Sequence, residues 1–179
     1  SLAYYPRLLY SLFLATALTP FRQKEKKMNK IIQQTTIKKP PVFLLGHWRG
    51  GTTYLHNLLS KDDDFGFFTT FDAYLSSAFL SGEKWLKPIV SGSLPERRPM
   101  DDVLMGADLP QEEEYALGGV SKFSYYHGWV FPKNMHRYNR YVWLDDVSSS
   151  DINKFKEVYL YLLKKQTLKS EGKQLLLKN

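Results

Sequence analysis

The sequence predicts an α/β domain with a central parallel sheet, and two observations predict it. Residues 42–45 form a short apolar run, followed by a glycine-containing loop and a stretch with helical spacing, which is the order strand, loop, helix. Near the other end, a long helical stretch precedes residues 174–177, Gln-Leu-Leu-Leu, which the sequence predicts as a second buried strand. Such runs are typical of strands buried on both faces of a parallel sheet. With 179 residues, 43% of them hydrophobic, the chain is long enough for one domain with a sizeable core.

The first element that the sequence predicts is a helix over residues 8–18, which Pro20 should end because proline cannot continue a helix. Residues 22–39 then carry seven Lys and Arg side chains and one acid, which accounts for +6 of the net charge of +7. We therefore divide the chain into an apolar helix with a basic connector, residues 1–39, and the α/β domain, residues 40–179.

Two interpretations of the first segment stay open. The helix could pack on the core and the connector could be solvated, or residues 8–39 could make peripheral contact with an anionic membrane. The apolar run 8–18 is too short to span a bilayer, which needs roughly 20 residues. Because the positive charge is concentrated in one segment, we expect no nucleic-acid partner. There is no cysteine and no N-x-[ST] sequon, and we expect a cytoplasmic protein, with or without membrane association.

The later elements follow from apolar spacing and from turn residues. The sequence predicts helices over 52–60, 72–80 and 112–117, an irregular aromatic-rich segment at 125–143, and a long helix that Ser149 or Ser150 caps and Gly172 ends. The alternation of helix and strand is still in progress where the sequence stops. We therefore expect a domain that is truncated at its C-terminus.

The most specific motif is the loop G-H-W-R-G-G-T-T at positions 46–53. Compared with the phosphate-binding pattern G-x-x-x-x-G-K-[ST], both glycines and Thr53 match, but Thr52 replaces the lysine. A loop at a helix N-terminus directs unpaired backbone N–H groups at an anion, and the guanidinium of Arg49 adds a planar fork suited to phosphate or sulfate oxygens. The alternative is a simple turn between a strand and a helix.

The missing lysine argues against an ATP- or GTP-hydrolysing enzyme, which needs that lysine and a magnesium ion held by a Walker-B acid. The four histidines form no metal-binding spacing, since His47 and His56 are nine residues apart, as are His127 and His136. The sequence therefore predicts an anion site without a metal.

Residues 41–59 resemble the 5′-phosphosulfate loop of sulfotransferases that use 3′-phosphoadenylyl sulfate (PAPS). The most similar branch has G-H-W-R-S-G-T-T-x-L-H-N-L-L, and Gly50 stands at the position of its serine. Residues 98–102 and 110–117 are similar to the R-P-M-D-N and P-Q-E-D-E-F-A-L segments of the same branch. The resemblance covers roughly residues 40–179.

This resemblance implies a P-loop-like three-layer fold and the transfer of a sulfuryl group from PAPS to a hydroxyl acceptor: a lipid, a glycan, a peptide or a small alcohol. The residues implied in binding the 5′-phosphosulfate, without a metal, are Arg49, Gly50, Gly51, Thr52 and Thr53. Family members bind the 3′-phosphate with an Arg and a Ser of a later segment, which would follow Asn179. Two alternatives remain: a P-loop nucleotide kinase-like protein, and a non-catalytic module that binds anions at a membrane surface.

Sulfuryl transfer needs positive charge on the leaving oxygen, which Arg49 could supply, and a base for the acceptor hydroxyl. Glu112 and Glu114 are the candidate bases, although positions 112 and 114 lie about 200° apart on a helix and cannot share one face. Either could instead be an acidic residue at a helix N-terminus. Asp72 is a further candidate, with a helix N-cap as its alternative role.

Two more features could contribute to the site. His47 lies in the loop and could contact the phosphosulfate or pack at the strand end. The aromatic residues Trp48, Tyr125, Tyr126 and Trp129 could line an acceptor pocket or belong to the core.

Overall fold

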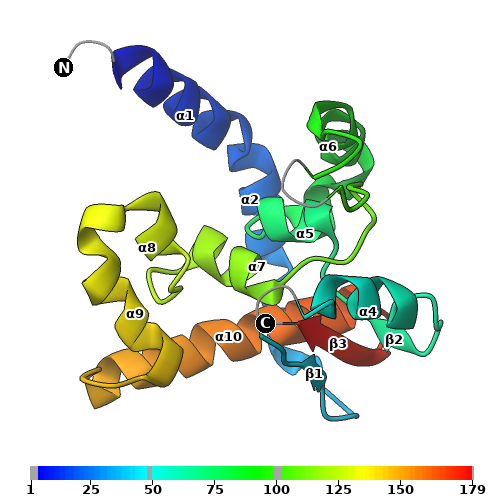
Figure 1. Cartoon of the computed structure of the whole chain (residues 1–179). Coiled ribbons are helices and arrows are strands. Elements are labelled where there is room, and N and C mark those ends of the chain that lie inside the picture. Colours follow the sequence, from blue (N-terminus) through cyan, green and yellow to red (C-terminus); the bar gives the residue numbers. More distant parts are fainter. Residues whose placement is uncertain (1–3, 48–49, 99–101, 179) are drawn as a thin grey trace.

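The computed structural model describes residues 4–47, 50–98 and 102–178. In chain order its elements are α1 (Tyr5–Ala17), α2 (Thr19–Lys27), α3 (Asn29–Gln34), β1 (Val42–Leu44), α4 (Thr52–Leu59), β2 (Phe65–Gly66), α5 (Thr70–Tyr74), α6 (Phe79–Ser93), α7 (Glu113–Val120), α8 (His127–Val130), the 3₁₀ helix η2 (Pro132–Asn134), α9 (Met135–Trp143), α10 (Ser149–Lys169) and β3 (Gln174–Lys178). The strands lie at one end of the molecule, and α1 and α6 lie at the other (Figure 1).

The described strands form a parallel sheet in the order β1-β3-β2. Val42 of β1 lies opposite Leu176 of β3, and Phe65 of β2 lies opposite Gln174 of β3. Helices and a small parallel sheet are compatible with the α/β class that the sequence predicts.

Burial differs between the two strands that the sequence predicts. Leu175, Leu176 and Leu177 of β3 are fully buried, as expected. In β1, Phe43 is 45% exposed, so the prediction that residues 42–45 are buried on both faces is wrong. The reason is the strand order, since β3 occupies the centre and β1 lies at an edge.

The core lies between the sheet and the helices α5, α6, α7 and α10. Its buried members include Phe68, Phe71, Phe79, Leu117, Leu162, Leu163, Leu175 and Leu177. The long helix α10 begins one or two residues earlier than expected, because Ser148 is its N-cap and accepts a hydrogen bond from the backbone of Asp151. Gly172 has the positive φ of 83° that suits a glycine after a helix end, as predicted.

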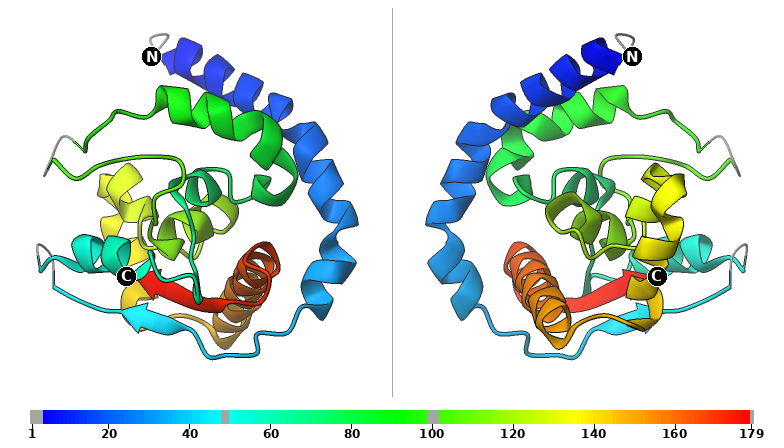
Figure 2. Two further views of the ribbon diagram at one scale, coloured as in Figure 1. Left: turned by 90° about the vertical axis from the view of Figure 1, so that its right-hand side faces the viewer. Right: turned by 90° about the vertical axis from the view of Figure 1, so that its left-hand side faces the viewer.

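The N-terminal arm, residues 5–34, consists of α1, α2 and α3 and curves around the rest of the molecule (Figure 2). Its basic part is helical, whereas we expected a connector. Pro20 lies in the first turn of α2, where its missing N–H removes no helical hydrogen bond, so it starts a helix after α1 has ended at Ala17. The arm packs through α2 against α6 and through α3 against α10.

Candidate functional site

The loop after β1 leads into α4 through two glycines whose backbone positions favour glycine. Gly51 is the N-cap of α4 and has a φ of 82°, in the left-handed region. Gly50 donates its N–H to the carbonyl oxygen of His47 at 3.0 Å, and a Cβ atom on Gly50 would lie 2.9 Å from that oxygen. Because Gly51 has no side chain, it cannot cap the first N–H groups of α4 with one.

Arg49 and Trp48 lie outside the described residues. The role of Arg49 in anion binding and catalysis, and that of Trp48 in an acceptor pocket, therefore stay predictions. Thr52 and Thr53 are both half-buried in the first turn of α4.

Lys178, the last residue of β3, lies against this first turn. In the parallel register it pairs with Leu44, two residues before the loop begins. Its ammonium group donates a hydrogen bond of 3.1 Å to the hydroxyl oxygen of Thr53 and forms an ion pair with Glu112. The structure thus brings together Thr53, Glu112 and Lys178 from three separate segments, with a positive charge at the N-terminus of α4.

Glu112 is not part of a helix, contrary to our expectation. It is the N-cap of α7 and has an extended backbone, so the argument that residues 112 and 114 lie on opposite helix faces does not apply. Glu112 instead faces Lys178, while Glu113 and Glu114 form the first turn of α7 and are buried.

Glu113 joins α7 to the end of β3. Its carboxylate accepts a hydrogen bond of 3.1 Å from the backbone N–H of Lys178 and one of 3.3 Å from the hydroxyl of Tyr159. Burial raises the pKa of Glu113 to about 7. The carboxyl group of Glu113 therefore fixes the backbone of Lys178 at the end of β3.

Glu114 faces a cavity of about 740 Å³. Its carboxylate accepts a hydrogen bond of 3.1 Å from the backbone N–H of Tyr125, and burial raises its pKa. The cavity wall is mostly apolar and aromatic, and its members include Leu45, Tyr125, Trp129, Val142, Trp143 and Tyr159. Leu45 directly precedes the loop, so the cavity begins next to the loop that leads into α4.

A further ionisable side chain near Lys178 is that of His56, in α4. It is 1% exposed, its ring packs edge-on against Phe67 at 6.2 Å, and its Nε2 atom has no hydrogen-bond partner among the described residues. Burial, with a contribution from the charge of Lys178, lowers the pKa of His56 to about 4. The imidazole is therefore neutral near pH 7.

Asp72 does not belong to this site. Its carboxylate accepts the backbone N–H of Thr69 in a capping box and forms an ion pair of 2.6 Å with Lys169. Both carboxylate oxygens of Asp72 have partners and the residue is fully buried. Asp72 therefore stabilises the start of α5, at position N3 of a capping box in which Thr69 is the N-cap. His47 is an exposed loop residue.

Lys178 is the site residue that sequence reasoning missed. A signal for it exists, because polar residues at the carboxyl ends of neighbouring parallel strands meet at one edge of the sheet. Lys178 directly follows the apolar residues Leu175–Leu177, as the loop 46–53 follows the run 42–45. Among the residues that the structure describes, no group of three or more His, Asp or Glu side chains could hold a metal ion.

Comparison with known proteins finds two similar curated sequences. Both are named omega-hydroxy-beta-dihydromenaquinone-9 sulfotransferase Stf3, one from Mycobacterium bovis (strain ATCC BAA-935 / AF2122/97) and one from Mycobacterium tuberculosis (strain CDC 1551 / Oshkosh). Each is 32% identical to this chain over 148 residues, which are 83% of the chain and 38% of the relative. The chain thus spans well under half the length of these relatives. No family model and no solved structure matches. The similarity supports a sulfotransferase family.

Proposed function

We propose that the chain is the donor-binding part of a PAPS-dependent sulfotransferase that acts on a hydroxyl acceptor. The observation that carries the proposal is the contact of Lys178 with Thr53 at the uncapped N-terminus of α4. The similarity to two proteins named as sulfotransferases supports the reaction class.

The chain offers a suitable set of donors for a 5′-phosphosulfate. Backbone N–H groups at the start of α4 and the hydroxyls of Thr52 and Thr53 would donate hydrogen bonds to its oxygens, and the charges of Arg49 and Lys178 would balance its negative charge. Lys178 comes from a neighbouring strand, so it supplies a positive charge that the loop itself lacks at position 52. The two glycines let the backbone approach the anion closely.

The PAPS donor supplies the sulfuryl group: the acceptor oxygen bonds to sulfur, the bond from sulfur to the phosphate oxygen breaks, and adenosine 3′,5′-bisphosphate leaves. Arg49 and Lys178 would stabilise the charge that builds on the leaving oxygen. Glu114 would take the acceptor proton. Its carboxylate is oriented by the backbone N–H of Tyr125, and its raised pKa makes it a better base than an exposed carboxylate.

The cavity beside Glu114 favours an apolar acceptor. Its wall of leucine, valine, tyrosine and tryptophan side chains would bury a hydrocarbon and leave a hydroxyl group next to the carboxylate. The two relatives are named for a hydroxylated menaquinone derivative, which supports a hydroxyl-bearing lipid over a glycan or a peptide.

Nucleotide binding tests the donor site. By titration calorimetry we expect the chain to bind PAPS in preference to ATP, with no effect of EDTA, because the loop lacks the Walker lysine. Lys178→Met and Arg49→Ala should each weaken binding roughly tenfold or more, since charge-assisted hydrogen bonds contribute about 1.5–3 kcal/mol. Lys173→Met, on an exposed residue just before β3, is the matched control and should bind like the parent. Tighter, magnesium-dependent ATP binding would contradict the proposal.

The rate of sulfuryl transfer identifies the base. Glu114→Gln should lower turnover by roughly 10²–10⁴-fold with little change in donor affinity. Glu112→Gln keeps an oxygen toward Lys178 and should stay within about tenfold of the parent. A large loss in Glu112→Gln with full rate in Glu114→Gln would assign the base to Glu112 instead.

A further inference from the structure

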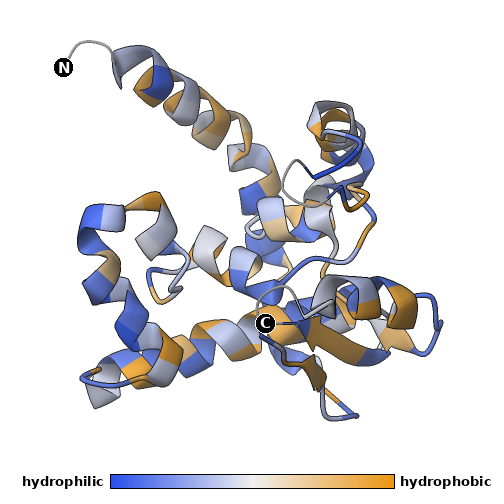
Figure 3. Cartoon of the chain, viewed as in Figure 1, coloured by the Kyte–Doolittle hydropathy of each residue, from blue (hydrophilic) through white to orange (hydrophobic). Residues whose placement is uncertain are grey.

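The first helix of the arm carries an apolar stripe that faces solvent. Its members recur at helical spacing and are each more than half exposed: Tyr5, Leu8, Leu9, Leu12 and Phe13. None of the described residues of α1 is buried, and Figure 3 shows apolar residues along its length. Exposed apolar surface of this extent on one helix is typical of an interaction site.

On α1, the stripe lies opposite the face that contains Leu14. Leu18 and Met28, which link the helices, keep right-handed helical dihedral angles, so the helical spacing continues through the arm. Positions 14, 18, 21 and 25 follow one face. On that face Phe21 lies against Gly82 of α6, and Glu25 is buried against the same helix.

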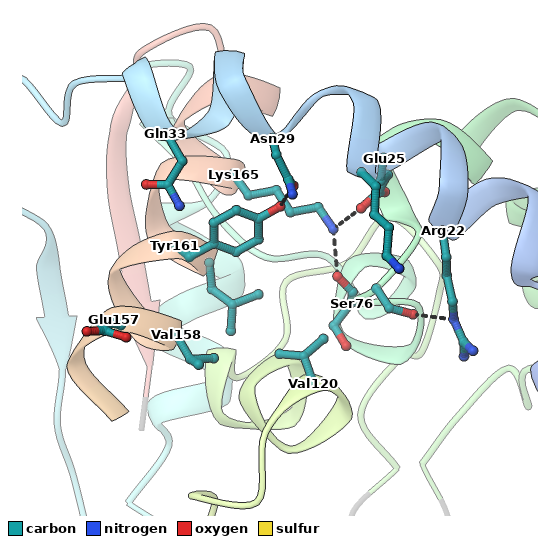
Figure 4. Close-up of a pocket in the computed structure, with 13 residues that line it drawn as sticks. Arg22, Glu25, Asn29, Gln33, Ser76, Val120, Glu157, Val158, Tyr161 and Lys165 are labelled. Carbon is teal, nitrogen blue, oxygen red and sulfur yellow. Dashed lines mark hydrogen bonds and ion pairs between the residues drawn. The ribbon is translucent and has the colours of Figure 1, made fainter. Parts of the chain in front are cut away.

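The exposed charged side chains of the basic segment are all lysines. Glu25 is its one acid, and the structure withdraws it from the surface: its carboxylate pairs with the buried Lys165 and accepts the N–H groups of Leu80 and Ser81 at 2.7 and 3.3 Å. Figure 4 shows this pair in the wall of a second cavity, of about 410 Å³, between the arm and α10. The lysines Lys24, Lys26, Lys27 and Lys30 remain exposed.

The helix α6 adds a second exposed patch at the same end of the molecule (Figures 1 and 2). Trp85 and Ile89 are one helical turn apart and are 66% and 68% exposed, and the ammonium group of Lys84 lies 5.6 Å from the Trp85 ring. Tryptophan beside lysine is typical of side chains at the boundary between water and lipid. Because Glu25 fixes α2 to the start of α6, the stripe and this patch are held in one arrangement.

We infer that the apolar stripe of α1, with the exposed lysines of the arm and Trp85 of α6, binds the surface of an anionic lipid bilayer. The apolar side chains would enter the boundary of headgroups and acyl chains, and the lysines would meet lipid phosphates. No described helix is long and apolar enough to cross a bilayer. A second copy of the chain fits less well, because pairing two arms would bring like charges together. The inference does not depend on the proposed sulfotransferase activity.

Vesicle co-sedimentation of the 179-residue chain tests the inference. We expect binding to phosphatidylcholine vesicles with 30% phosphatidylglycerol, weaker binding to pure phosphatidylcholine, and loss of the difference at high salt. Leu9→Glu with Phe13→Glu should reduce partitioning about a hundredfold. Val130→Glu, on an apolar residue of α8 that is 64% exposed and does not line the larger cavity, is the control and should bind like the parent.

A second set of variants, with a matched control, tests how much the lysines contribute to vesicle binding. Lys24→Gln with Lys27→Gln should weaken binding to the anionic vesicles about fivefold per lysine. Lys154→Gln with Lys156→Gln, on exposed lysines of α10, removes the same charge elsewhere and should have little effect. Since all these positions are exposed, unchanged urea midpoints would verify that the variants fold.

Brominated lipids give a readout of depth. They should quench a component of tryptophan fluorescence that Trp85→Phe removes and Trp143→Phe retains. Equal binding of the parent and the α1 variant would overturn the inference. Failure of the parent chain to bind anionic vesicles would also overturn it. If the parent sediments as a dimer and binds no vesicle, a second copy of the chain covers the apolar stripe instead. PAPS binding is measured separately and should be the same in all of these variants.

Discussion

Two buried ionisable side chains beneath the site, Glu113 and His56, depart from their ordinary pKa values in ways that burial explains. Removal from water disfavours the charged form, which raises the pKa of a carboxyl group and lowers that of an imidazole. Glu113 and His56 are thus both held toward their neutral forms next to Lys178, whose backbone Glu113 binds. This leaves Lys178 and Glu112 as the charged pair that faces the start of α4.

The pKa of Glu113 makes stability depend on pH. The folded state holds the proton up to about pH 7, whereas an unfolded chain releases it near 4.5. Its stabilising contribution is therefore complete below about pH 4.5 and is lost as the pH rises through 7, by on the order of 3 kcal/mol at most. In urea denaturation between pH 5 and 8, Glu113→Gln should lose less stability with rising pH than the parent does. Parallel curves for the two proteins would show that Glu113 is already ionised at pH 5.

His56 has the opposite sign and acts at lower pH. Its folded pKa of about 4 lies below the ordinary 6.5, so its contribution is present above pH 6.5 and is lost as the pH falls toward 4. Between about pH 4.5 and 6.5 the two contributions change in opposite directions and largely cancel, so Glu113→Gln should uncover the loss of stability that His56 causes as the pH falls through this range.

At the scale of elements, the unit β1–loop–α4 depends on the backbone of one residue. Gly51 has a positive φ, and a Cβ atom added to it would meet no described atom within 4 Å. A substitution there would therefore strain the backbone rather than clash with a neighbour. The strain would act at the point where α4 presents its N–H groups.

A pair of glycine variants separates backbone strain from packing. Gly51→Ala should destabilise the protein by about 1–2 kcal/mol, because an L-residue resists the left-handed region, and should weaken PAPS binding. Gly92→Ala, in α6, also adds a methyl group to open space but at an ordinary helical φ, and should be neutral or stabilising by up to about 1 kcal/mol. Urea midpoints and calorimetry of the two variants check this. Equal effects would mean that the φ of Gly51 does not determine the stability of the loop.

At the scale of the whole molecule, one buried ion pair ties the N-terminal arm to the body. Lys165 of α10 is 1% exposed, donates a hydrogen bond of 2.6 Å to the backbone carbonyl of Ser76, and pairs with Glu25 of α2. Its ammonium group also lies 4.0 Å from the centre of the Phe79 ring. Burial lowers the pKa of Lys165, so its ammonium form depends on the nearby negative charge of Glu25.

Removing one partner of this pair should be costly. Lys165→Met leaves the Glu25 carboxylate buried without its counterion, and we expect a loss of about 3–5 kcal/mol in the free energy of unfolding. Adding Glu25→Gln, which keeps an oxygen for the N–H groups of α6, should recover part of that loss. Lys122→Met breaks the pair with Asp151, in which the lysine side chain is 64% exposed, and should cost no more than about 1 kcal/mol. If Lys165→Met costs as little as Lys122→Met, the arm is held mainly by its other contacts, which include the hydrogen bonds from Arg22 to Ser77 and from Tyr161 to Asn29.

The sequence by itself predicted a class of fold that is compatible with the structure, and it predicted the kind of site, which stays a prediction. Short apolar runs predicted the parallel strands, helical spacing predicted α4 and α10, and the G-H-W-R-G-G-T-T loop predicted an anion site at a helix start. These features are local, because the spacing of apolar residues and the backbone conformation of a turn depend on residues that are close together in the sequence.

The tertiary structure decided everything that depends on residues distant in sequence. It placed β1 at the edge of the sheet, paired Asp72 with Lys169, put Glu112 on Lys178 and Glu114 in a cavity wall, and buried Glu25 so that the arm exposes its lysines. Acidic residues look alike in a sequence. Whether one is a base, a cap or a counterion depends on which distant charge the packed chain brings to it, and on how much water the packing removes.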